Sequence, residues 1–245
     1  LAAIATPAQA FNFNTGSDLG ACGVLVDNFA PIPSGALLDD TTDVKACTTA
    51  DGFTLEVKKP EDGYLQGKHV NGVSGVGITS PGPTLGEIGG KGAEQEIMKV
   101  TLPAAEQLSA LGLSFLYEIG EVGDVVNEQA KVWVSDQLYG ILSVLSETEA
   151  EWVVYTGGVA GAGKTYTGDF TSAGPGYVNI LNPFANVEIS AFKLLAPATT
   201  AGNTFRYSDF ALVNADINGV PEPAALLGLG AVGAAMLGLR RRRSL

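Results

Sequence analysis

Histidine, cysteine and basic residues are scarce in this chain of 245 residues. It has one histidine, two cysteines and 14 Lys+Arg against 26 Asp+Glu, which gives a net charge of −12. A surface this acidic repels phosphates, so the composition argues against binding to nucleic acid or to anionic lipid. His69 is the only imidazole available as a catalytic base, and Ser74 near it lies in no nucleophile-elbow motif. We expect a protein without catalytic activity and without a cofactor.

The two cysteines, Cys22 and Cys47, both lie in the first fifth of the chain. With no histidine near them they do not make a zinc site, whereas in an oxidising compartment they would close a loop of about 25 residues. On the loop-entropy argument such a bridge stabilises the folded state by about 3 kcal/mol. We predict a disulfide, with a metal-binding pair as the alternative.

Long helical patterns are also absent, and glycine is abundant. The chain has 32 glycines, 12 prolines and a hydrophobic fraction of 46%. This composition favours short strands joined by turns over long helices. Alternation supports the same interpretation, because Leu111, Leu113 and Phe115 share one face of a strand while Gly112 and Ser114 lie on the other.

We therefore predict an all-β fold, an antiparallel β-sandwich of the jelly-roll type, over residues 11–219. Residues 11–50 are rich in loops and are expected to pack as edge strands tied down by the disulfide. A single helical turn is expected at 104–110. The expected strands are 53–58, 70–78, 96–102, 111–117, 130–135, 139–145, 152–156, 166–170, 177–181, 187–195 and 205–213.

Residues 1–10 have the composition of the end of a secretory signal peptide. A short apolar run is followed by the helix-breaking Pro7 and then by Ala8 and Ala10, the small residues of an A-x-A cleavage site. We expect these residues to be the remnant of a signal peptide that is removed after Ala10, and the rest of the chain to be exported.

Residues 220–245 contain three signals in series. An uncharged, mostly apolar stretch of 16 residues, 224–239, is about 24 Å long as a helix, which is short for a hydrocarbon core of about 30 Å. The basic cluster after it is expected to stay in the cytoplasm. We predict a short transmembrane helix that anchors the chain in the inner membrane only until it is processed. The flanking signals are the tripeptide Pro221, Glu222, Pro223 and the cluster Arg240, Arg241, Arg242, Arg243.

Together these three elements resemble the PEP-CTERM sorting signal. In that family the tripeptide marks the region where an exosortase, a membrane-embedded cysteine transpeptidase, cuts the protein and releases or transfers it. Such proteins come from bacteria that make extracellular polysaccharide. The resemblance implies an exosortase as partner and a location in the periplasm, at the outer surface or outside the cell. Parts of the body, such as 75–78, 86–88 and 96–100, also resemble β-sandwich regions of proteins with this tail.

Residues 158–165 match the nucleotide-binding pattern G-x-x-x-x-G-K-[ST], with Gly158, Gly163, Lys164 and Thr165 at the defining positions. A P-loop must open a helix whose N-terminus faces the phosphates. Here three glycines and a proline follow within eleven residues, and no βαβ pattern surrounds the match. We interpret the segment as a flexible hairpin loop that matches by chance, and we expect no nucleotide site.

After nucleotide, calcium is the second ligand that the sequence suggests, because the chain is rich in acidic residues. Ca²⁺ takes six to eight oxygen ligands, and the segment 123–128 brings Asp124 and Glu128 into one expected loop. No EF-hand spacing is present. A solvated acidic surface is the competing interpretation, and both stay open.

Trp133 lies on the polar side of an expected strand. Ala130, Val132 and Val134 share one face, which leaves Trp133 with Lys131 on the other. An exposed indole beside hydrogen-bonding groups is suited to stack against the apolar face of a sugar ring. Burial of Trp133 in the core is the alternative.

The sequence thus predicts an exported, non-enzymatic protein of the envelope, the extracellular matrix or a biofilm. Two alternatives stay open. One is a carbohydrate-binding sandwich module that acts on matrix polysaccharide through Trp133. The other is a glycan-active hydrolase, because two carboxylates brought together by a fold leave no signature in a sequence.

Overall fold

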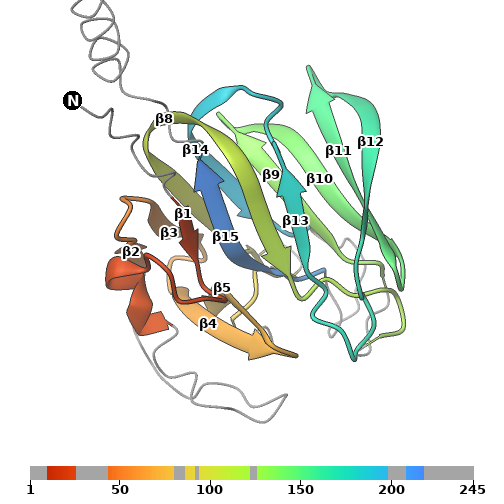
Figure 1. Cartoon of the computed structure of the whole chain (residues 1–245), viewed down its shortest axis with the longest axis horizontal. Helices are drawn as coiled ribbons and strands as arrows, with labels where there is room; N and C mark the ends of the chain where they lie inside the picture. The colour runs from red at the N-terminus through yellow and green to blue at the C-terminus, as the bar shows by residue number, and fades with distance from the viewer. Residues whose placement is uncertain are drawn as a thin grey trace, which may run out of the picture.

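The computed structural model describes residues 10–25, 44–79, 86–91, 94–121, 126–197 and 208–217. These residues are mostly strand, and the one helical segment among them is the short 3-10 helix η1, Gly20–Leu25. The strands pair antiparallel (Figure 1). The predicted all-β fold of antiparallel sheets is confirmed for this part of the chain.

The strands form two sheets that share the long strand β8 (Figure 1). In the first sheet the order is β12-β11-β10-β9-β14-β8, and β3 and β2 continue beyond β8. In the second sheet β8 lies between β13 and β15, and β15 also pairs with β1 and with the hairpin β5-β4. A separate small hairpin joins β6 to β7.

The bounds of the strands are as follows. The first sheet contains β2 Ala46–Thr48, β3 Thr54–Lys59, β8 Ile97–Ser114, β9 Gln129–Val134, β10 Gln137–Ser146, β11 Glu149–Thr156, β12 Val159–Thr167 and β14 Glu188–Leu195. The second contains β1 Ala10–Asn12, β4 Tyr64–Val70, β5 Val73–Thr79, β13 Val178–Leu181 and β15 Ala211–Ile217, and the small hairpin is β6 Gly90–Lys91 with β7 Glu94–Gln95.

β8 passes from one sheet to the other because its two halves pair with different strands. Val100 lies opposite Phe192 of β14 and Leu55 of β3, whereas Leu111 lies opposite Ile180 of β13 and a residue of β15. Two stretches that the sequence predicts as separate strands are therefore one continuous strand that bends between the sheets.

The helical turn predicted at 104–110 is wrong. These residues belong to β8, where Gln107 lies opposite Glu188 of β14 and Ala110 lies opposite Asp216 of β15. Alanine, glutamate, glutamine and leucine favour helices only weakly, by a few tenths of a kcal/mol each. Ladder hydrogen bonds to strands on both sides outweigh that preference.

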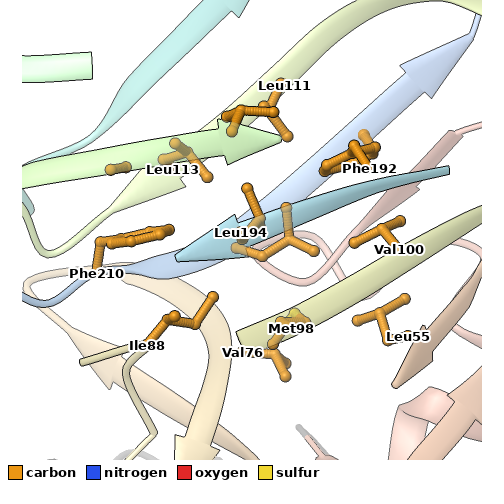
Figure 2. Close-up of a cluster of buried hydrophobic side chains, with 14 of the residues drawn as sticks. Leu55, Val76, Ile88, Met98, Val100, Leu111, Leu113, Phe192, Leu194 and Phe210 are labelled. Atoms are coloured by element: carbon orange, nitrogen blue, oxygen red, sulfur yellow. The ribbon is translucent and has the colours of Figure 1, made fainter. Parts of the chain in front are cut away.

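The hydrophobic core lies between the two sheets. β8 contributes Met98 and Val100 from its first half and Leu111 and Leu113 from its second half, all fully buried. Two sheets packed through their apolar faces make the fold β-sandwich-like. Figure 2 shows these side chains with Leu55, Val76, Ile88, Phe192, Leu194 and Phe210.

Three hairpins turn through two residues with positive φ, as in type I′ turns. Asn71 and Gly72, with φ of 49° and 82°, join β4 to β5. The single strand predicted over 70–78 is therefore wrong at its start, and β4 is missing from the prediction although Asn-Gly is a strong hairpin signal. The other two turns are Ser135-Asp136, with φ of 49° and 61°, and Gly157-Gly158, with φ of 59° and 82°.

The N-terminal segment is attached to the sandwich by strand pairing, aromatic packing and a disulfide. The ring of Phe11 is 5.4 Å from that of Phe13 and 5.1 Å from that of Phe53, centroid to centroid. The predicted disulfide between Cys22 and Cys47 is confirmed, with 5.1 Å between the two Cα atoms. It links η1 to β2.

Candidate functional site

The sorting tail and most of the signal-peptide remnant lie outside the described residues, as does Asp124. The predictions for them therefore stay predictions. Over the ranges that the structure describes, no helix is both long and apolar enough to cross a membrane. The undescribed tail residues are Pro221, Glu222, Pro223, the stretch 224–239 and Arg240, Arg241, Arg242 and Arg243.

The P-loop match forms a strand rather than the flexible loop that the sequence suggests. Gly158 lies in the turn before β12, and Lys164 and Thr165 lie within β12, opposite Trp152 and Glu151 of β11. Its residues belong to a β ladder with β11, and Gly168 follows the strand without a helix. The loop-then-helix geometry that cradles phosphate in a P-loop is therefore not formed by this segment.

Glu128 is fully buried, not part of a solvated acidic surface. Its Oε2 accepts a hydrogen bond from the backbone N–H of Tyr117 at 2.6 Å. Its backbone N–H donates to the carbonyl of Tyr117, and its carbonyl accepts from Val144. Glu128 thus joins the segment after β8 to the start of β9. Among the described residues, no group of three or more His, Cys, Asp or Glu side chains is arranged to hold a metal ion.

Lys68 supplies a positive charge to this acidic region. Its Nζ lies 2.5 Å from Oε1 of the buried Glu87 and 5.2 Å from the ring centroid of Phe115. Burial by itself lowers the pKa of Lys68, but the charge and hydrogen bond of Glu87, with smaller contributions from Asp209 and Glu128, leave this pKa raised. The ammonium group of Lys68 therefore supplies the positive charge that balances the nearby carboxylates.

His69 and Ser74 face each other across the β4–β5 hairpin. Nδ1 of His69 lies 2.8 Å from Oγ of Ser74, and the backbone N–H of Ser74 donates to Oδ1 of Asn14 at 3.1 Å. This contact was not predicted from the sequence, and it follows from the two-residue Asn-Gly turn between them. Ser74 is buried and lies in a regular strand, whereas the serine of a nucleophile elbow is held exposed on a sharp turn.

Trp133 lies on the outer face of the first sheet, opposite the core. Its neighbours in β9, Ala130 and Val132, are fully buried, while Trp133 itself is partly exposed. Its Nε1 is buried and has no hydrogen-bond partner among the described residues. The part of the indole that reaches the surface is therefore carbon. Trp152, by contrast, is a core residue and only 4% exposed.

Strand register places a second aromatic side chain on the same outer face. Trp133 lies opposite Leu138 of β10, and β11 pairs with the other edge of β10. Val154 of β11 packs against the core, so strand alternation directs Tyr155 outward. With about 4.8 Å between neighbouring strands, the backbones of Trp133 and Tyr155 lie about 10 Å apart across β10.

Three lysines share this face with Trp133. Lys193 of β14 lies directly opposite Trp133, Lys99 of β8 lies opposite Lys193, and Lys131 precedes Trp133 by two residues on the same side of β9. Nζ of Lys193 hydrogen-bonds Oδ1 of Asp136, and this bond, followed by the charge of Lys193, lowers the pKa of Asp136. We call this surface the Trp133 face and define it by Lys99, Lys131, Trp133, Leu138, Tyr155 and Lys193.

Residue alternation along the chain predicts the position of Trp133 and Lys131 but does not indicate the other members of the Trp133 face. Alternation within a strand shows which way each side chain points, and that signal was present for Tyr155 and for Lys193. Only the pairing of β8, β14, β9, β10 and β11 brings them together, because register is set between strands. These residues are interpreted from their geometry, since comparison of the chain with protein-family models, with curated proteins and with solved structures found no match.

Proposed function

We propose that this chain is an exported, non-enzymatic protein of the cell envelope or the extracellular matrix. The observation that carries the proposal is the disulfide between Cys22 and Cys47, because such bridges form and persist in oxidising compartments. Both cysteines are buried, so the bridge is a structural one rather than an exposed redox pair. The acidic composition suits a domain that works away from nucleic acid and anionic lipid.

Sorting and processing through residues 220–245 is the second part of the proposal. The resemblance to the PEP-CTERM signal supports it: an exosortase cuts near Pro221, Glu222 and Pro223, and the apolar stretch 224–239 holds the chain in the inner membrane until then. The mature protein is then a sandwich domain free of the membrane. The jelly-roll connectivity of that sandwich stays a prediction.

Mass spectrometry of the protein isolated from its native cells tests export and processing together. We expect the mature form to begin at Phe11 and to lack Arg240–Arg243. Replacing Pro221, Glu222 and Pro223 together by alanine should leave the tail attached, whereas Glu188→Ala, an exposed change in the body, should not affect cleavage. An exported mature protein that still carries its arginine cluster would contradict the processing proposal.

A carbohydrate-binding role is the second candidate function, and the Trp133 face is the observation that favours it. The surface brings aromatic carbon and cations together on one face of the first sheet. Binding of a sugar is therefore the activity to test at this face.

A further inference from the structure

We propose that the Trp133 face binds an anionic polysaccharide whose sugar rings carry carboxylates, as in a polymer of uronic acids. The proposal names the ligand class for the matrix role proposed above and in that respect rests on it. Its basis is a juxtaposition: a partly exposed indole stands among three lysines on one sheet face of a chain whose net charge is −12.

The aromatic part of the Trp133 face is suited to a sugar ring. Because Nε1 of Trp133 is buried, a ligand meets only the carbon surface of the indole. The π-face of an aromatic ring is negative, and the C–H bonds on one face of a pyranose ring are weakly positive, so the two attract. Tyr155 offers a second ring across β10, and Leu138 between them keeps the surface apolar.

The lysines determine which polysaccharide fits. Lys193 is 34% exposed and contacts Asp136, whose side chain is 81% exposed. Ion pairs between exposed groups contribute little, so a ligand carboxylate can replace Asp136 at little cost. Lys131 and Lys99 are both partly exposed. Lys99 continues the row of Trp133 and Lys193 onto β8, where it also lies opposite Glu56 of β3, and Lys131 lies two residues along β9 from Trp133. Neighbouring strands lie about 4.8 Å apart, which is close to the length of one pyranose residue. Successive sugars of a polysaccharide that runs across the sheet can therefore contact side chains of successive strands.

Charge complementarity favours a polyuronate over a neutral glucan, and the acidity of the rest of the chain disfavours nucleic acid. Non-specific binding of DNA or RNA needs many phosphate contacts, because each one releases a counterion. Three lysines on an otherwise acidic protein do not provide them. A carboxylated sugar needs only the few cations present, since stacking on Trp133 adds affinity that does not depend on charge.

Isothermal titration of the purified protein with polygalacturonate tests the proposal, with dextran and oligo-dT as neutral and nucleic-acid controls. We expect saturable binding of polygalacturonate at low salt, and at least about tenfold weaker binding of both controls, since tenfold corresponds to about 1.4 kcal/mol. Affinity should fall as salt is added, because the lysine contacts are exposed and screened.

Variants separate the contribution of stacking from that of charge. Trp133→Ala should weaken binding about tenfold, while Trp133→Phe should retain most of it, because a phenyl ring still stacks. The double change Lys131→Gln and Lys193→Gln should weaken binding and flatten its salt dependence. The matched control is Lys45→Gln with Lys59→Gln, which makes the same charge change at exposed positions elsewhere and should leave affinity unchanged.

Tryptophan fluorescence locates the ligand directly. The chain has two tryptophans, and Trp152 is buried, so a change in emission on adding polygalacturonate reports on Trp133. Trp133→Phe should still bind by titration but lose the fluorescence change. Melting temperatures close to that of the parent protein show that each variant is folded.

Four results would overturn the proposal: no binding of polygalacturonate, equal binding of dextran, equal binding of oligo-dT, or an equal loss in the Lys45 and Lys59 control. These outcomes are distinguishable from failure of the export proposal. Binding is measured on purified protein, whereas export and processing are measured on material from cells.

Discussion

The six-membered ring of Trp152 occupies the space that a side chain on Gly140 would fill. A Cβ added to Gly140 would lie 2.2 Å from Cη2 and 2.3 Å from Cζ2 of Trp152. Gly140 is next to the irregularity in β10 and is one residue after Tyr139, which packs on the core through Phe184. The indole of Trp152 can therefore pack against residue 140 only because this residue has no side chain.

Gly140→Ala should destabilise the fold by about 1 to 3 kcal/mol, the usual cost of overpacking a core. Urea denaturation measures this free energy of unfolding. In a Trp152→Phe background the same substitution should cost clearly less, because the smaller ring leaves room for the methyl group. Equal costs in the two backgrounds would mean that the two residues are not coupled.

Replacing both Cys22 and Cys47 by serine should lower the free energy of unfolding by about 3 kcal/mol, because the bridge spans a sequence separation of 25 residues. Chemical denaturation of the oxidised protein, the reduced protein and the double variant measures the loss. Reduction should have no further effect on the double variant. A reduced protein as stable as the oxidised one would show that the disulfide restricts the unfolded chain little.

Lys68→Met should destabilise the fold by about 2 to 3 kcal/mol, because it leaves the buried carboxylate of Glu87 without its ammonium partner. The matched control is Lys58→Met, which breaks the exposed pair with Glu56 and should cost less than about 1 kcal/mol. The pKa of Lys68 is raised above 10.5, so its contribution is complete below that pH and is lost as pH rises through the raised pKa. The difference between Lys68→Met and the parent should therefore be constant from pH 7 to 10 and shrink only at higher pH.

Asp216→Asn should stabilise the protein at neutral pH. Burial raises the pKa of Asp216 above 3.8, and the hydrogen bond from Asn214 offsets this only in part. The folded state therefore binds this proton more tightly than the unfolded state, and stability falls as pH rises from 3.8 through the raised pKa. Thermal melts should show a higher melting temperature for the variant at pH 7 and little difference near pH 3.

Asp136→Asn gives the opposite sign and serves as the control for that experiment. Lys193 lowers the pKa of Asp136, so the contribution of Asp136 is present above 3.8 and is lost as pH falls through the lowered pKa. Any destabilisation by Asp136→Asn should be present at pH 7 and vanish in acid. Two variants with the same pH profile would show that at least one of the two carboxylates does not respond to its surroundings as described.

Lys164→Ala should increase self-association. Among the described strands β12 is the last of the first sheet, its residues 159–165 are all exposed, and Lys164 is its only charged side chain. Exposed edge strands pair with other chains unless charge prevents it. Sedimentation velocity over a range of concentrations measures the effect, and Lys164→Glu should stay as dispersed as the parent.

The same Lys164→Ala variant tests the P-loop interpretation, because the lysine of a P-loop contacts the phosphates. We expect equilibrium dialysis with ATP to show no saturable binding by the parent protein or by the variant. ATP binding that Lys164→Ala abolishes would contradict the assignment of this segment as an edge strand without a nucleotide role.

Local patterns in the sequence were sufficient to predict much of the fold. The alternation of Leu111 and Leu113 with Gly112 and Ser114 identifies a half-buried strand, because successive side chains of a strand point to opposite faces. The isolation of Cys22 and Cys47 from any histidine predicts their disulfide. In both cases the information lies in residue types and near neighbours, so no tertiary contact is needed to recover it.

Residue types and their alternation thus predict strands, a disulfide and a polar strand face that carries Trp133. They do not indicate that 104–110 is strand, that Glu128 is buried near Lys68, or that Lys193, Lys99 and Tyr155 share the face of Trp133. These features depend on strand register, which comes from pairing between segments far apart in sequence. Each such pairing depends on how both sheets close over one core, and no local pattern of residues contains that information.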